Sequence, residues 1–256
     1  MKKLISLFAA ACLYGISAQA QVLPCPTVNA GLDQTICAPN CATLNMTLST
    51  PINATTNYTI STPAFAPDPW GVGTTVTMWD DDMQGPFNIG FCFNFWGNAY
   101  TQFYIGSNGW MGFSPGQTAT WVISGAIPNN TGAAPRNCIM GPWHDINPGV
   151  GGTVRYQMYG TAPCRRLVVQ WYQVPMYSCG TPASQQIVIY ETTNHIDNYI
   201  LSKPLCTSWN GGYAIQGLHN ITGTAAIVVP GRNFPTQWVA ANDAKRYTPS
   251  GVPMTT

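Results

Sequence analysis

The sequence contains very little charge. Only 10 Lys and Arg and 9 Asp and Glu residues occur among 256, which is 7% of the chain, whereas a typical soluble domain carries about 25%. The net charge is +1, and no basic run follows Lys3. Because nucleic-acid binding needs clustered Lys and Arg to displace phosphate counterions, this composition excludes nucleic acid as a partner. A neutral polar surface of this kind suits a secreted β protein.

Long apolar runs are missing after the first segment of the chain. Lys2 and Lys3 precede an apolar stretch over 4–16, and Ala18-Gln19-Ala20 has the pattern of a cleavage site. Together these features predict a signal peptide over 1–20. The apolar stretch falls short of the roughly 20 residues that a transmembrane helix needs, and no later segment reaches that length. We therefore expect a secreted or outer-surface protein whose mature chain starts at Gln21 and has no transmembrane segment.

Helical periodicity is missing as well. After residue 55 the sequence consists of short β-branched and aromatic runs separated by Gly, Pro, Asn and Asp, which is typical of strands and turns. In 87–97, Phe and Ile alternate with mostly polar residues, as in a half-buried strand. Asn108-Gly109 predicts a tight hairpin, and 185–193 is expected to pair with 196–201. About ten to twelve short antiparallel strands predict an all-β fold, a disulfide-bonded β-sandwich.

Composition also divides the chain into parts. Residues 21–55 contain three Cys and four Pro and are expected to form a Cys-rich, strand-containing lead-in. Residues 56–248 are expected to form the sandwich, in which Trp238–Lys245 leaves room for at most one helical turn. The Pro- and Thr-rich end, 249–256, is interpreted as a linker or truncated tail before further domains.

The cysteines predict disulfides. The chain has nine, and eight remain without Cys12; an even number in an exported protein indicates a disulfide framework rather than zinc. If the strands around 138–143 and 153–159 form a hairpin, its open end carries Cys138 and Cys164, and the next hairpin likewise carries Cys179 and Cys206. These considerations favour the bridges Cys138–Cys164 and Cys179–Cys206. The competing bridge is Cys164–Cys179, and Cys25 would pair with Cys37 or Cys41, leaving the other for Cys92.

The segment Trp143-His144-Asp145 offers two interpretations. His and Asp side by side can form a general base or a metal ligand pair, but a metal site needs three or four converging ligands and the chain has only three His. The favoured interpretation is a strand exit, with Trp143 anchored in the core. Asp145 and Asn147 would then cap the turn through side chain-to-backbone bonds.

The run Asp80-Asp81-Asp82 is the only run of three like charges. Three carboxylates in a loop can contribute to a Ca²⁺ site, which takes six to eight oxygens. The D-x-D-x-D-G spacing of a calcium loop is absent, so the run is expected to be a solvated turn. We accordingly expect no cofactor, with Ca²⁺ on Asp80, Asp81 and Asp82 as the alternative.

Catalytic motifs are also lacking. Glycosidases need two carboxyl groups about 5–10 Å apart, yet the chain has one Glu, Glu191, and no motif supports its other acids. Residues 106–109 do not form G-x-S-x-G, so no nucleophile elbow is present. We therefore expect no enzyme. The abundant aromatic residues leave room for a ligand face, and three Trp flank Gly- and Asn-rich loops: Trp121, Trp209 and Trp238.

Several of these segments resemble known extracellular proteins. The stretch "FNIGFCFNFWGNAYTQFYIGSNGWMGFS", followed by "IMGPWHDINPGVGGTVRY", resembles the nidogen-type extracellular domain. In that family a strand ending in Asn-Gly leads to a Pro-aromatic-Trp-x-Asp-x-Asp segment. Here Pro142-Trp143 lacks the intervening aromatic residue, and Asn147 stands where a second Asp is common.

A string of shorter motifs extends the resemblance over roughly 75–250. "WDDD", "GPWHDINP", "APCRRLVV" and "WNGG" are similar to segments of gliding-motility-associated bacterial surface proteins of the type IX secretion type, and "NAGLDQTIC" is similar to the opening strand of their PKD-like repeats. The resemblance implies a nidogen-like sandwich that serves as a non-catalytic module in adhesion or matrix contact. Its partner would be an extracellular glycan or protein surface. The alternatives are a carbohydrate-binding module and, from another class, a secreted glycoside hydrolase.

Overall fold

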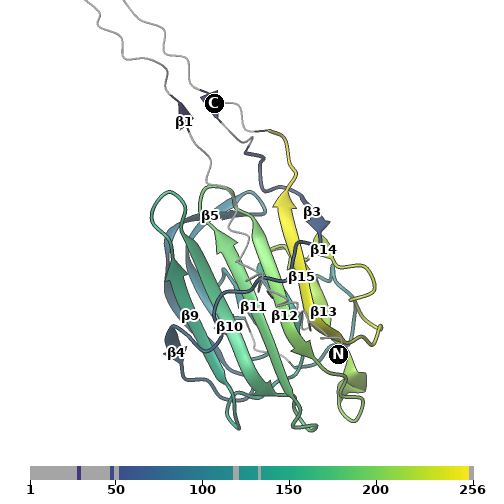
Figure 1. Ribbon diagram of the computed structural model, residues 1–256. Helices are drawn as coiled ribbons and strands as arrows, with labels where there is room; N and C mark the ends of the chain where they lie inside the picture. The colour runs from purple at the N-terminus through teal and green to yellow at the C-terminus, as the bar shows by residue number, and fades with distance from the viewer. Residues whose placement is uncertain (1–27, 30–46, 49–51, 118–120, 132–133, 254–256) are drawn as a thin grey trace, which may run out of the picture.

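Two antiparallel sheets make up the body of the protein (Figure 1). The computed structural model describes residues 28–29, 47–48, 52–117, 121–131 and 134–253. The expected signal peptide, most of the lead-in and residues 254–256 lie outside the described residues. Within the described part, no helix is long and apolar enough to cross a bilayer.

The broader sheet has seven strands and contains most of the second half of the chain. Its order is β3 (Tyr58–Ser61), β15 (Ala240–Pro249), β12 (Ile196–Lys203), β11 (Pro182–Tyr190), β10 (Arg166–Pro175), β9 (Thr153–Tyr159) and β4 (Thr74–Val76). Three of its pairings, β9 with β10, β10 with β11 and β11 with β12, join strands that are consecutive in the chain. The pairing of β11 with β12 confirms the one expected between 185–193 and 196–201.

The second sheet has six strands and contains the turn at Asn108-Gly109. Its order is β14 (Ala226–Val228), β13 (Ile215–His219), β8 (Cys138–Trp143), β7 (Trp110–Gly112), β6 (Asn98–Gly106) and β5 (Met83–Phe95). Gly106 pairs with Trp110 across the predicted turn. A separate pair, β1 (Val28–Asn29) with β2 (Thr47–Leu48), lies in the lead-in, and the 3₁₀ turn η1 spans Asn210–Gly212. The all-β sandwich is confirmed, with 13 strands in its two sheets rather than ten to twelve.

The core lies between the sheets and follows the alternation of the sequence. In β5 the residues at 89, 91, 93 and 95 are buried, while those at 88, 90 and 92 are exposed. Phe93 and Phe95 have no exposed surface, and Trp171 of the opposite sheet is equally buried in the same cluster. Each such aromatic side chain contributes a large apolar area to the core.

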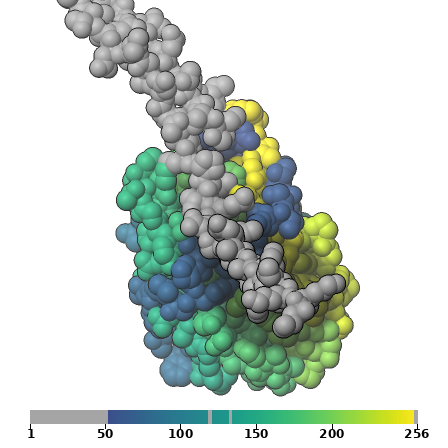
Figure 2. All heavy atoms as spheres, in the orientation of Figure 1, coloured from purple at the N-terminus to yellow at the C-terminus, as the bar shows by residue number. Residues whose placement is uncertain are grey.

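The last strand, β15, corrects two expectations. Trp238–Lys245 contributes to a strand rather than a helical turn, because β15 pairs with β12 on one side and β3 on the other. Its pairing with β3 reaches Pro249, and Asn53 bridges Pro253 beyond it. The end of the chain is thus part of the sandwich up to residue 253 rather than a linker from 249. In Figure 2 the first described residues of the sandwich lie beside the yellow C-terminal strand.

The cysteine pairing is confirmed for one bridge and wrong for the other. Cys179 and Cys206 form a disulfide with a Cα–Cα distance of 5.9 Å. Cys138 is instead a free, buried thiol whose Sγ lies 3.3 Å from the Pro135 carbonyl. The reason is topological: β8 belongs to the six-stranded sheet and β9 to the other, so the assumed hairpin does not exist.

Two further cysteine expectations are also wrong. Cys92 is a free, exposed thiol on β5, so it does not tie the lead-in to the sandwich. The competing bridge Cys164–Cys179 does not form, because Cys179 is bonded to Cys206. Cys164 is disulfide-bonded, but none of the other cysteines that the structure describes is its partner.

Removing the Cys179–Cys206 bridge is expected to destabilise the sandwich. The bridge closes a loop with a sequence separation of 27, which corresponds to about 3–4 kcal/mol in the chain-entropy model. The double variant Cys179→Ser/Cys206→Ser should therefore unfold at a clearly lower urea concentration. Cys92→Ser is the matched control and should change stability by less than about 0.5 kcal/mol. Equal midpoints for the double variant and wild type would contradict this assignment.

Candidate functional site

The segment after β8 carries the chain from one sheet to the other. Trp143, the last residue of β8, is 1% exposed, which confirms the predicted core anchor at a strand exit. Asn147 caps the turn as expected, since its Oδ1 accepts a hydrogen bond from the Gly149 amide at 2.8 Å. Asp145 does not cap the turn: its Oδ2 accepts a 2.6 Å hydrogen bond from the Trp209 indole.

His144 is buried inside this crossing and is held by Gln185. Its Nε2 lies 2.9 Å from Gln185 Oε1, and since a carbonyl oxygen only accepts, Nε2 carries the proton. The other ring nitrogen, Nδ1, is buried without a hydrogen-bond partner. Burial, aided by the positive charge of Lys203, lowers the pKa of His144 to about 3 against the opposing bond from Gln185. The imidazole is therefore neutral at pH 7.

Gln185 joins the two sheets at the same place. Its Nε2 donates to the carbonyls of Pro142, at 2.7 Å, and of Gly109, at 3.1 Å. Gly109 has a φ of +84°, and a Cβ there would lie 2.2 Å from the Pro142 carbonyl oxygen. The turn therefore needs glycine both for its backbone conformation and for the close approach.

Asn108, the preceding residue, organises three loops. It is fully buried, and its side-chain Nδ2 donates to Asp81 Oδ1 at 2.8 Å. Its Oδ1 accepts from the Ile146 amide at 3.1 Å, and its backbone carbonyl accepts from the His144 amide. The turn that holds Asp81 and the segment that holds Asp145 are thereby fixed to each other.

Three carboxylates converge at this junction. Oxygens of Asp80, Asp81 and Asp145 all lie within 4.8 Å of one another. Asp82, which the sequence grouped with its neighbours as a Ca²⁺ ligand, does not belong to this set. Its Oδ2 instead accepts hydrogen bonds from the Trp79 amide at 3.2 Å and Gln84 Nε2 at 2.8 Å, so this carboxylate is bound by its own neighbours in the chain.

The electrostatics of this cluster are unfavourable without a compensating charge. Burial, aided by the nearby charges of Asp81 and Asp80, raises the pKa of Asp145 to about 7 despite the hydrogen bond from Trp209. Burial also raises the pKa of Asp80 and of Asp81. The cluster thus favours binding either a proton or a cation.

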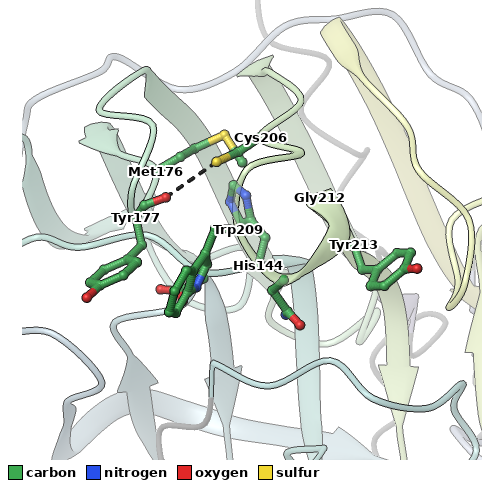
Figure 3. A pocket seen from close by; sticks show the side chains of 9 residues that line it. His144, Met176, Tyr177, Cys206, Trp209, Gly212 and Tyr213 are labelled. Carbon is green, nitrogen blue, oxygen red and sulfur yellow. Dashed lines mark hydrogen bonds between the residues drawn. The ribbon is translucent and has the colours of Figure 1, made fainter.

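An aromatic surface lies beside Asp145. The Trp209 ring centroid is 5.2 Å from that of Trp121 and 4.7 Å from that of Tyr177, so the structure brings together two of the three predicted ligand-face tryptophans. Figure 3 shows the Tyr177 and Trp209 rings side by side at one edge of a pocket, with the Tyr213 ring on the other side. The cavity volume is only about 10 Å³, which is room for about one water molecule. Any larger ligand would contact the ring surface from outside.

Trp238, the third predicted tryptophan, is not part of an exposed surface. It is 9% exposed, its indole donates to the Ala214 carbonyl at 2.8 Å, and Lys203 and Arg232 lie over its ring. It is a core residue because β15 begins nearby, at Ala240, and draws this segment onto the sheet.

The three histidines do not converge. His195 lies between β11 and β12, and burial lowers its pKa. His219 is fully buried, with Nδ1 2.8 Å from the Pro135 carbonyl and Nε2 accepting from the Asn129 amide at 3.2 Å. Burial lowers its pKa as well. Together with His144, each ring is thus committed to local packing rather than to a shared site.

Sequence reasoning missed the grouping of Asp145 with Asp80 and Asp81, and the roles of Asn108 and Gln185. No local signal marks that grouping, because the two acidic segments are far apart in the chain. The Asn108-Gly109 signal was recognised as a turn only. The glycine of this pair also allows the backbone of another segment to approach closely, and that implication was missed.

Comparison with known proteins gives one match. A family model described as NIDO related matches residues 54–250, which is the whole sandwich and more than half of the chain. Searches of curated proteins and of solved structures found no match.

Substituting Gly109 is expected to disrupt the junction of the sheets. Gly109→Ala places a methyl group against the Pro142 carbonyl and the Gln185 amide, so the loss of stability should exceed the roughly 1–2 kcal/mol of a left-handed residue. Gly116→Ala is the matched control, with a φ of +71° and no atom within 4 Å. Urea denaturation should show the larger loss for Gly109→Ala. Equal losses would contradict the close approach.

Acidification is expected to destabilise the protein through His219. Burial lowers the pKa of His219 in the folded state, whereas the unfolded chain keeps the usual histidine pKa of about 6.5. As the pH falls through this value, the unfolded chain therefore binds a proton that the folded chain does not. Stability should thus be full above about pH 6.5 and fall as the pH decreases. His219→Asn can retain the bond to Pro135 without titrating, so its melting temperature should fall less than that of wild type between pH 7 and pH 5. Parallel curves would show that His219 does not contribute.

Proposed function

Because the chain belongs to the NIDO-related family, we propose that it is a non-catalytic module of a secreted or cell-surface protein that acts in adhesion. The family match over residues 54–250 carries this proposal, since the family fits a non-catalytic extracellular module. The Cys179–Cys206 disulfide supports it, because disulfides persist in oxidising compartments outside the cytosol. The motif string resembles segments of gliding-motility-associated surface proteins, and on this resemblance we place the module on a bacterial surface, in contact with extracellular glycan or protein.

The contact surface that we propose is the aromatic cluster beside the crossing. Tyr177 is 37% exposed, and its ring packs on Trp209, which in turn packs on Trp121. Three loops contribute these residues, and the Cys179–Cys206 disulfide ties the loop of Tyr177 to that of Trp209. Rigid aromatic side chains give a large contact area at a low entropic cost, which is why they are enriched in binding sites.

Carbohydrate binding is the second candidate, favoured by the gathering of Trp121, Trp209 and Tyr177. Sugar rings stack on exposed aromatic faces. The rings are tilted by 37° and 49° to their neighbours, however, so they form a curved rather than flat surface. This shape suits a protein segment or a single sugar residue better than an extended polysaccharide.

A hydrolase is the less favoured class. Asp145 lines the pocket, whereas Asp80 and Asp81 do not, and the cavity volume of about 10 Å³ is far too small for a sugar ring. Glycosidases require two carboxyl groups that flank a bound glycosidic bond. The arrangement of these acids therefore supports a non-catalytic role.

Binding of the purified full-length chain to arrays of glycans and of extracellular matrix proteins tests the proposal. We expect saturable binding that Trp121→Ala/Tyr177→Ala weakens by tenfold or more, since each such aromatic anchor contributes on the order of 1–2 kcal/mol. Trp70→Ala/Tyr172→Ala is the matched control, because it removes another stacked ring pair, elsewhere on the protein, and should leave binding unchanged. Equal losses in both variants would argue against the aromatic cluster. Cleavage products from a bound glycan, detected by mass spectrometry, would contradict the proposed adhesive function and indicate a hydrolase.

A further inference from the structure

The acids of the described residues fall into two groups. Asp68, Glu191, Asp197 and Asp243 each form a salt bridge with Arg or Lys. Asp80, Asp81, Asp82 and Asp145 form none with the Lys and Arg residues that the structure describes, and three of them, Asp80, Asp81 and Asp145, converge. In a protein with only 9 acidic residues, collecting three at one place without a basic partner is compatible with a site for an external cation.

Asp145 provides a second, independent indication. It is only 8% exposed, and its Oδ1 is buried without a hydrogen-bond partner, while Oδ2 is occupied by the Trp209 indole. A buried carboxylate oxygen without a donor is unfavourable, and buried polar atoms of this kind are normally satisfied by protein, water or an ion. Oδ1 is therefore the atom available for a ligand.

From these observations we propose that Asp80, Asp81 and Asp145 form a Ca²⁺ site. The site lies beyond the adhesive role proposed above and does not depend on it. One oxygen of each residue lies within 4.8 Å of the others, a spacing that two ligands of one Ca²⁺ can span at the usual 2.3–2.6 Å. The donor set is oxygen only, and Ca²⁺ accepts such ligands in a flexible geometry, whereas Mg²⁺ demands a near-ideal octahedron. The donor set thus suits Ca²⁺.

The loops around the site are fixed before any ion binds. Asn108 holds Asp81 through Nδ2 and the Asp145 segment through Oδ1. Asp82 is held by the Ser107 hydroxyl, which accepts from its amide at 2.9 Å. A Cβ on Gly149 would lie 3.5 Å from the Trp79 ring and 3.6 Å from the Asp80 amide nitrogen, which shows that the two loops pack closely. Little ordering is therefore needed when the ion binds.

The remaining ligands would be water, because Asp80 and Asp81 are exposed. Three carboxylates complete only part of the six to eight oxygens that Ca²⁺ takes, and partly hydrated sites of extracellular modules bind in the range of about 10⁻⁴–10⁻³ M. A bound cation would also offset the negative charge of the three carboxylates that converge here.

Calcium titration of the full-length chain, purified with EGTA and then freed of it, tests the site. We expect isothermal titration calorimetry to show one Ca²⁺ site, and the melting temperature to rise by about 3–6 °C at tenfold excess over the dissociation constant. Asp145→Asn and Asp81→Asn should each abolish both effects. Asp145→Asn is expected to fold, because a neutral amide replaces a carboxylate that is costly to bury.

Asp82→Asn is the matched control. It makes the same charge change next to the site, and its amide oxygen can keep the hydrogen bond from the Trp79 amide, so Ca²⁺ binding should weaken by less than threefold. Tb³⁺, which substitutes for Ca²⁺, supplies a local readout: luminescence excited through nearby Trp79 and Trp209 should appear in wild type and be lost in Asp145→Asn.

Two results would overturn the site. The first is an absence of binding heat and of a melting shift in wild type at 10 mM CaCl₂. The charge of the carboxylates would then be compensated by a shared proton. The second is a melting shift that is equal in wild type and Asp145→Asn, with CaCl₂ or with MgCl₂. Such a shift would result from ionic screening rather than from a specific site.

Discussion

The side chain of Gln185 joins the two sheets at the point where the chain crosses between them, and the arrangement of the site depends on this contact. Its amide donates to the Pro142 and Gly109 carbonyls and its carbonyl accepts from His144. Because the group is 1% exposed, every one of these bonds must be made in the folded state. They fix the end of β8 and the turn at Asn108-Gly109 relative to β11. The sheets are therefore held in one register where the functional loops begin.

This junction determines what the loops can present. Asn108 lies one residue from the Gln185 contact and holds Asp81 and the segment of Asp145 together. The Asp145 carboxylate in turn accepts a hydrogen bond from the Trp209 indole, and Trp209 belongs to the aromatic cluster. An acidic cluster and an aromatic surface thus share one residue. A substitution at Asp145 would therefore alter both the acidic cluster and the aromatic surface.

Local sequence patterns were a good guide to the elements themselves. The alternation at 87–97 predicted the buried face of β5, and Asn108-Gly109 predicted the turn between β6 and β7. The same reasoning failed where the partner of a strand is distant. β8 and β9 are consecutive strands and were expected to form a hairpin, yet β8 pairs with β7 and β13. The predicted Cys138–Cys164 bridge depended on that hairpin and was wrong for the same reason. Pairing of consecutive strands is common, but only long-range packing decides each case.

The sequence by itself determined the all-β class, the positions of most strands and the core anchor at Trp143, because side-chain periodicity and turn chemistry act over a few residues. It also revealed the scarcity of charge that makes a cluster of acids conspicuous. Tertiary structure alone decided that Asp145 joins Asp80 and Asp81 while Asp82 turns away, and that Trp121 and Trp209 meet while Trp238 is buried. These groupings arise when loops from opposite sheets meet at one end of the sandwich. No pattern within either loop encodes the identity of the other.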